Sequence, residues 1–115
     1  MIDEIIQRQV DAYNERNLIK MMTFFSEDIQ IFNFAEQEPL VKGIKEVEKL
    51  YKNVFDHSPD LHAEILNRIV FDDKVIDQER VTIRKGEALM EVVAIYELAQ
   101  GLITRVYFIQ KKKGH

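Results

Sequence analysis

Two carboxylates in the second half of the chain have the residue types and the spacing for acid–base chemistry. Asp77 and Glu79 are two residues apart, so on an extended strand both point to the same face. Val75 and Val81 share that face, which makes it the more apolar one. A carboxylate on a buried apolar face is costly unless it is paired or has a chemical role. Asp77 and Glu79 are therefore the candidate catalytic bases, with Arg68 as a candidate to hold a substrate oxygen.

The neighbours of these carboxylates depend on the turn near Asp72 and Asp73. A two-residue turn places Arg68 and His62 beside the two carboxylates and gives the better charge pairing. A three-residue turn matches the apolar faces better, and the residues that then take this place are Ala63, Ile65, Asn67 and Ile69. The sequence leaves both registers open. It also leaves open a structural role, in which these charges form ion pairs on the outer face or at a dimer interface.

Five further residues are candidates for ligand binding, and each also has a structural interpretation. Asn33 lies between two phenylalanines on an alternating segment, where it can orient a ligand carbonyl or be a hydrogen-bonded core amide. Tyr13, Tyr51 and Phe55 lie at helical spacing, which indicates core packing and also allows them to line a cavity. His62 follows a proline-containing turn at the start of a predicted strand, where a histidine is either partly exposed or part of the site.

The pattern along the chain predicts helices followed by strands. Apolar residues at spacings of three and four predict helices that begin near Ile2, Leu18 and Ile44. Residues 26–28 read as a turn and residues 35–42 as a polar loop. Alternating patterns predict strands over 29–34, 61–71, 75–84, 88–98 and 102–110. The last four strands form two hairpins and should pair as an antiparallel meander.

This order of elements predicts an α+β fold with a pocket. Helices that are segregated from an antiparallel sheet pack on one of its faces. A twisted sheet of four or five strands curls instead of lying flat, so the helices close one side of a cone. The open mouth of such a cone is a natural site for a small molecule.

Three segments carry a resemblance to a known family: VDAYNERNLIKMMTFFSEDIQIF, VKGIKEVEKLYKNVF and LITRVYF. Together they resemble the nuclear transport factor 2-like superfamily, which includes SnoaL-like polyketide cyclases and steroid delta-isomerases. The resemblance extends over roughly Ile5 to Ile109. It implies a cone-shaped α+β roll with a curved antiparallel sheet, three N-terminal helices and an apolar cavity. It also implies a homodimer that forms through the outer face of the sheet.

The residues of the steroid isomerases are not kept at the matching positions. That resemblance places the carboxylate base on Asn33, the helix tyrosine on Gln9 and the late aspartate near Ala94. An asparagine has no titratable carboxylate and cannot be a general base. Epoxide hydrolases of the same superfamily use carboxylates and an arginine on the long strands to activate a water, which fits the candidates Arg68, Asp77 and Glu79.

The composition narrows the range of functions. The chain has 115 residues and a net charge of −4, so we expect one domain over residues 1–110, a basic tail over 111–115 and no nucleic-acid partner. It has no cysteine, and its three histidines lack metal-ligand spacing, so we expect no metal and no cofactor. No apolar segment is long enough to cross a membrane, and the first residues lack the features of a signal peptide. These features predict a cytoplasmic protein.

The sequence predicts a protein that binds a small, largely apolar molecule. One alternative is a cofactor-independent isomerase, cyclase, lyase or hydrolase that uses Asp77 or Glu79 as the base. Arg68 or Asn33 then holds an oxygen. The other alternative is a dimerisation or partner-docking domain without catalysis.

Overall fold

The computed structural model describes residues 1–111, which form three helices and a six-stranded sheet. In chain order these elements are α1 (Ile2–Asn14), α2 (Leu18–Met22), β1 (Phe25–Asn33), β2 (Val41–Lys42), α3 (Ile44–His57), β3 (His62–Phe71), β4 (Lys74–Thr82), β5 (Met90–Ala99) and β6 (Leu102–Gln110). The predicted α+β class is confirmed. The predicted basic tail lies, apart from Lys111, outside the described residues.

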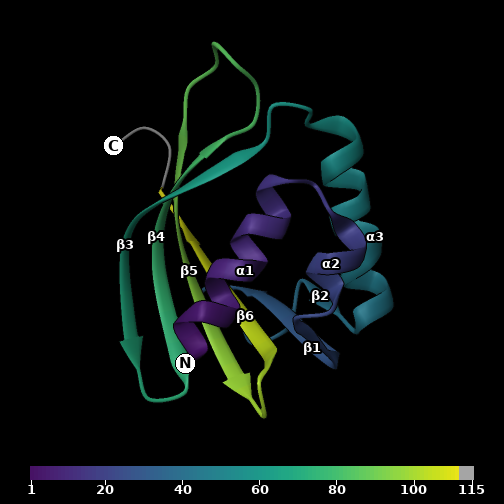
Figure 1. Ribbon diagram of the computed structural model, residues 1–115, viewed down its shortest axis with the longest axis vertical. Coiled ribbons are helices and arrows are strands. Elements are labelled where there is room, and N and C mark those ends of the chain that lie inside the picture. Colours follow the sequence, from purple (N-terminus) through teal and green to yellow (C-terminus); the bar gives the residue numbers. More distant parts are fainter. Residues whose placement is uncertain (112–115) are drawn as a thin grey trace.

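The sheet has the strand order β2-β1-β6-β5-β4-β3. Strands β3 to β6 form the predicted antiparallel meander. The sheet is mixed, however, because β1 pairs with β6 in parallel while β2 pairs with β1 antiparallel. The sheet curls around α1, and α2 and α3 lie to one side of it (Figure 1). This arrangement is the open cone expected from the sequence, with the helices on the concave side.

Each helix begins and buries residues for reasons visible in the sequence. Helix α1 is amphipathic, and its apolar stripe faces the sheet. Helix α2 begins after Asn17, whose side-chain oxygen accepts a hydrogen bond from the Lys20 amide at 3.1 Å. Helix α3 begins after Gly43, which has a φ of +91°, a conformation that glycine adopts without steric cost.

Two predicted segments were wrong. Residues 26–28 continue strand β1 instead of forming a turn, and residues 41–42 of the predicted loop form β2. The pairing of β1 with β6 is irregular between Phe25 and Gln30, so the polar residues Glu27 and Asp28 lie exposed within a strand. Strand β2 contributes only two residues to the sheet, too few to produce an alternating pattern.

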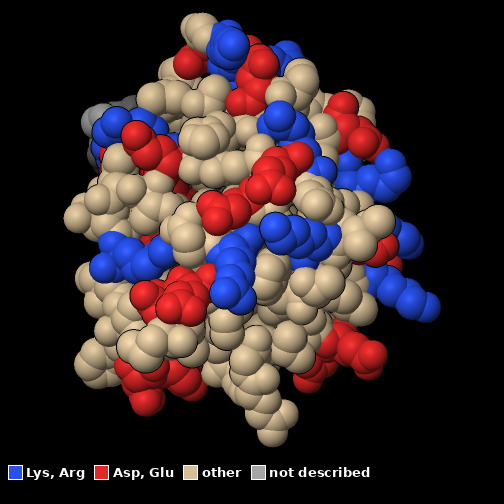
Figure 2. All heavy atoms as spheres, in the orientation of Figure 1, with Lys and Arg blue, Asp and Glu red and all other residues tan. Residues whose placement is uncertain are grey.

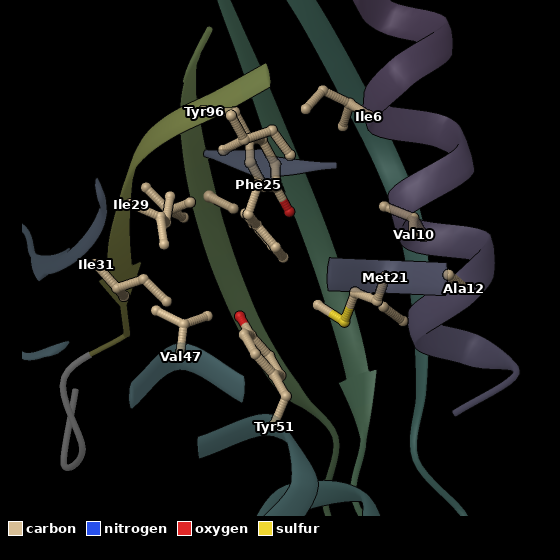
Figure 3. Packing of buried hydrophobic residues seen from close by; sticks show 14 of the residues in the cluster. Ile6, Val10, Ala12, Met21, Phe25, Ile29, Ile31, Val47, Tyr51 and Tyr96 are labelled. Carbon is tan, nitrogen blue, oxygen red and sulfur yellow. The ribbon is translucent and has the colours of Figure 1, made fainter. Parts of the chain in front are cut away.

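The core lies between the helices and the concave face of the sheet. Side chains from α1, α2, α3 and the strands converge there, as Figure 3 shows for Val10, Met21, Val47 and Tyr96. On the outside, acidic and basic side chains are interspersed over the helix-bearing face of the described chain (Figure 2). Within residues 1–111, no helix is both long and apolar enough to cross a membrane.

Candidate functional site

The β3–β4 hairpin combines the two registers that the sequence left open. Its turn has two residues, since Phe71 pairs with Lys74, and Arg68 therefore lies opposite Asp77. Nearer the start of β3, a bulge at Leu66 shifts the register. Because a bulge adds one residue to one strand, the residues before it change face. As a result Ile65 lies opposite Glu79 and Ala63 opposite Val81, while His62 and Glu64 point outward.

Asp77 and Arg68 form an ion pair that is buried at the carboxylate and partly exposed at the guanidinium. Asp77 is 0% exposed, and Arg68 donates two hydrogen bonds to it, from Nε to Oδ1 at 2.7 Å and from Nη2 to Oδ2 at 2.9 Å. Arg68 Nη1 also donates to Gln7 Oε1 on α1 at 2.9 Å. This two-point geometry is the strong form of a guanidinium–carboxylate pair. The pair links β3, β4 and α1, so Asp77 has a structural partner.

Glu79 lies on the same face of β4 but has a different environment. It is 7% exposed, and Tyr96 on β5 donates a hydrogen bond of 3.4 Å to its Oε2. Burial, and secondly the charge of Asp77, raise the pKa of Glu79 from 4.5 to about 7, against the opposing effects of Tyr96 and Arg68. A carboxyl group with this pKa is present in both protonation states near neutral pH, as a general acid or base requires.

Glu79 lines a cavity of about 280 Å³ between α1, α3 and strands β3 to β6. Most of the lining side chains are apolar or aromatic, and the complete set is Gln9, Val10, Tyr13, Leu50, Tyr51, Val54, Ala63, Glu79, Val81, Ile83, Met90, Val92, Tyr96, Phe108 and Gln110. Gln9, Glu79 and Tyr96 are buried and form the inner end, whereas Met90 and Gln110 are exposed and mark the mouth. The cavity is therefore an apolar space with polar groups at its inner end.

Gln9 is a cavity residue that the sequence did not identify as a binding candidate. Its side chain is almost fully buried, at 4% exposed, and its Oε1 atom has no hydrogen-bond partner. A buried acceptor without a partner is unfavourable unless a ligand or a water molecule donates a hydrogen bond to it. The available signal was an amide within the apolar stripe of α1, at the position where the family resemblance expects a tyrosine.

Three tyrosines form much of the aromatic wall. Tyr13 contacts Tyr51 edge to face with ring centres 6.2 Å apart, and Figure 3 shows Tyr51 reaching inward from α3. Burial is the main cause that raises the pKa of Tyr13, Tyr51 and Tyr96, and the charge of Glu79 adds to it. These hydroxyls therefore stay protonated near neutral pH. The ring of Phe55 packs on that of Tyr13, with their centres 5.8 Å apart. Phe55 therefore supports this wall from outside the cavity lining.

The other predicted residues lie away from the cavity. His62 is exposed on the outer face of β3, opposite Thr82. Asn33 is half-buried at the end of β1, opposite Phe108, and is outside the cavity lining. The structure thus brings Tyr13, Tyr51 and Glu79 together around the cavity, whereas Arg68 and Asp77 are outside its lining. In the described part of the chain, no group of three or more acidic or histidine side chains is arranged to hold a metal ion.

Solved structures with the same fold come from several bacteria. A cystatin-fold protein from Novosphingobium aromaticivorans is 24% identical, with a TM-score of 0.83 over 92% of this chain and 95% of that one. A proposed ketosteroid isomerase from Kribbella flavida is 14% identical, with a TM-score of 0.84 over 99% of this chain and 80% of that one. A proposed SnoaL-like polyketide cyclase from a Jannaschia species is 18% identical, with a TM-score of 0.79 over 96% of this chain and 85% of that one. At these identities the likeness is one of fold.

The family is established by a match to the sequence. No curated protein matches the chain. The model of the SnoaL-like domain matches residues 6–106, which is most of the chain. The chain therefore belongs to the SnoaL-like domain family and has the nuclear transport factor 2-like fold that its sequence predicts.

Proposed function

We propose that this protein binds a small, largely apolar molecule in the cavity between α1, α3 and the sheet. The observation that carries the proposal is the cavity itself, about 280 Å³ in volume, with apolar walls and three buried polar side chains at its inner end. Small-molecule sites combine an apolar lining with a few convergent polar groups in this way. The apolar body of a ligand would contact the walls, and its polar end would meet Gln9 and Glu79.

A variant with a filled cavity tests this proposal. Val54 lines the cavity from α3 and is only partly buried, so Val54→Phe adds volume inside the cavity at a modest cost to folding. We expect wild-type protein to bind members of a library of small apolar compounds, measured by ligand-dependent melting and by NMR. The variant should lose this binding while it keeps its circular dichroism spectrum. Equal binding by both proteins would place the ligand elsewhere.

A second candidate function is proton transfer without a cofactor, with Glu79 as the acid or base. The specific observation in its favour is the pKa of Glu79, raised to about 7 by burial, on a side chain that lines the cavity. The proposed isomerase and the proposed cyclase among the similar structures are consistent with this chemistry. The steroid-isomerase pattern itself does not support it, since Asn33, Gln9 and Ala94 occupy the three matching positions.

Glu79→Gln separates binding from catalysis. The amide keeps the shape of the side chain and removes its ability to exchange a proton. Once a converted ligand is known, unchanged affinity with lost turnover would assign the proton transfer to Glu79. Retained turnover would remove Glu79 from that role and leave the binding proposal intact.

The outer face of the sheet supports a homodimer as part of the same proposal. A row of apolar side chains crosses five neighbouring strands, and its members are Ile69, Ile76, Ile95, Tyr107 and Phe32. Ile69 is 57% exposed, and beside this row Glu97 lies opposite Arg105. Two copies related by a two-fold axis can cover the row and pair these charges in both directions. Sedimentation should show a dimer that Ile95→Lys converts to a monomer, and a wild-type monomer would contradict this.

A further inference from the structure

Strand β4 buries two carboxylates, and only one of them has a counter-ion. Asp77 accepts two hydrogen bonds from Arg68, whereas the single hydrogen bond to Glu79 comes from the neutral hydroxyl of Tyr96. The bulge at Leu66 contributes to this difference, because it turns His62 to the outer face and places Ile65 opposite Glu79. Among the residues that line the cavity there is no lysine, arginine or histidine. Within residues 1–111, therefore, no cationic side chain lines the cavity.

Two polar side chains of the cavity also have acceptor atoms that the described residues leave without a full set of donors. Gln9 Oε1 is buried and has no donor, and the carboxylate of Glu79 can accept more bonds than the one that Tyr96 supplies. A ligand that satisfies these atoms must bring hydrogen-bond donors. A ligand carboxylate or phosphate would bring further acceptors and a second negative charge, so the site disfavours anions.

The walls around these acceptors suit a positive charge. Tyr13, Tyr51, Tyr96 and Phe108 line the cavity together with Glu79. The face of an aromatic ring attracts a cation, and the attraction is stronger where water is excluded. A carboxylate, a free amide oxygen and several rings around one small space are the features that recognise an organic ammonium group.

We infer that the ligand is a small organic amine, bound as its ammonium ion. The ammonium group lies at the inner end, where it donates hydrogen bonds to Glu79 and to Gln9 Oε1. The apolar body extends along the aliphatic wall toward Met90. This inference depends on the proposed binding in the cavity and is independent of the proton-transfer candidate. The ligand provides for Glu79 the counter-ion that Arg68 provides for Asp77.

Three probes with the same apolar body test the inference. The probes are 2-phenylethylamine, 2-phenylethanol and 3-phenylpropionate, whose head groups are cationic, neutral and anionic at neutral pH. By NMR titration we expect the amine to bind at least roughly tenfold more tightly than the alcohol, and the carboxylate to bind most weakly. An alcohol that binds as tightly as the amine would overturn the inference and leave the cavity proposal standing. If none of the three probes perturbs the cavity residues, the cavity proposal fails with it.

Variants at Glu79 and at an outer glutamate provide the matched comparison. Glu79→Gln should weaken binding of the amine roughly 10- to 100-fold and leave binding of the alcohol nearly unchanged. Glu64→Gln makes the same change of charge on the exposed outer face of β3, and it should alter neither the binding of the amine nor that of the alcohol. Gln9→Leu removes the free acceptor and should weaken binding of the amine several-fold. It gives a second test if Glu79→Gln is poorly folded. Unchanged affinity for the amine in both cavity variants would overturn the inference.

Discussion

Two positions on the same face of strand β4, Asp77 and Glu79, differ in how the protein surrounds a buried carboxylate. At Asp77, Arg68 provides a two-point ion pair and a link to α1. At Glu79, two residues further along the same face, the neighbouring strands present Ile65 and Val92, and within residues 1–111 its side chain accepts one hydrogen bond, from Tyr96. The first carboxylate is fully partnered by the protein and supports the fold. The second keeps a raised pKa and unused acceptor capacity beside a cavity, which is the arrangement expected of a functional group.

The largest effect should follow from removal of the counter-ion of Asp77. Arg68→Ala removes the ion-pair partner of Asp77 at a fully buried position. Loss of one partner of a buried ion pair costs about 3–5 kcal/mol. We therefore expect a decrease of this size in the free energy of unfolding, measured by urea denaturation at neutral pH. Arg80→Ala is the control, because its 3.8 Å pair with Glu64 is exposed, and it should change the stability by less than about 1 kcal/mol.

A double variant shows whether that loss comes from the unpaired charge. Replacing both partners, as in Arg68→Met with Asp77→Leu, removes the charge as well as its counter-ion. Apolar replacement of a whole buried pair is often neutral or stabilising. The double variant should therefore recover most of the stability that Arg68→Ala loses. A double variant as unstable as the single one would mean that Arg68 acts mainly through its contact with Gln7 on α1.

The effect of Glu79 on stability should depend on pH. Folding raises the pKa of Glu79 from 4.5 to about 7, so the folded protein prefers the protonated form. This carboxyl costs no stability below about pH 4.5, and the cost grows as the pH rises to about 7. Above that pH the ionised group costs on the order of 3 kcal/mol. Glu79→Gln should therefore stabilise the protein at about pH 8 by that amount more than it does at about pH 4.5.

The measurement for this effect is denaturant unfolding of both proteins across the pH range. Direct titration of the Glu79 carboxyl carbon by NMR should give a midpoint near 7 in the absence of ligand. If the difference in stability between wild type and Glu79→Gln is the same at about pH 4.5 and at about pH 8, Glu79 titrates as an ordinary carboxyl. Addition of the amine probe should lower the midpoint, because a cation favours the ionised form.

The sequence predicted the fold in more detail than it predicted the site. Helical spacing and the alternating pattern from residue 61 onward depend on neighbours along the chain, so these local features were sufficient. The sequence could not predict which faces Arg68 and His62 occupy, because each depends on the register of the hairpin. The two-residue turn places Arg68 opposite Asp77, whereas the bulge at Leu66 turns His62 to the outer face. Gln9 becomes a cavity residue only once α1 packs on the sheet, and its chemistry depends on a missing partner.

The smallest expected effect concerns Gln9, the amide on α1 that lines the cavity together with Glu79. Gln9→Leu replaces a buried acceptor that has no partner with an apolar side chain of similar length on an apolar helix face. Relief of one unsatisfied buried acceptor should stabilise the protein without ligand by roughly 1 kcal/mol, measured by urea denaturation. The matched control is Gln7→Leu, which removes an acceptor that Arg68 uses and should destabilise instead. Changes of opposite sign in the free energy of unfolding for Gln9→Leu and Gln7→Leu would show that Gln9 destabilises the protein without ligand because its acceptor stays free. Glu79 on β4 has the same effect when it is ionised.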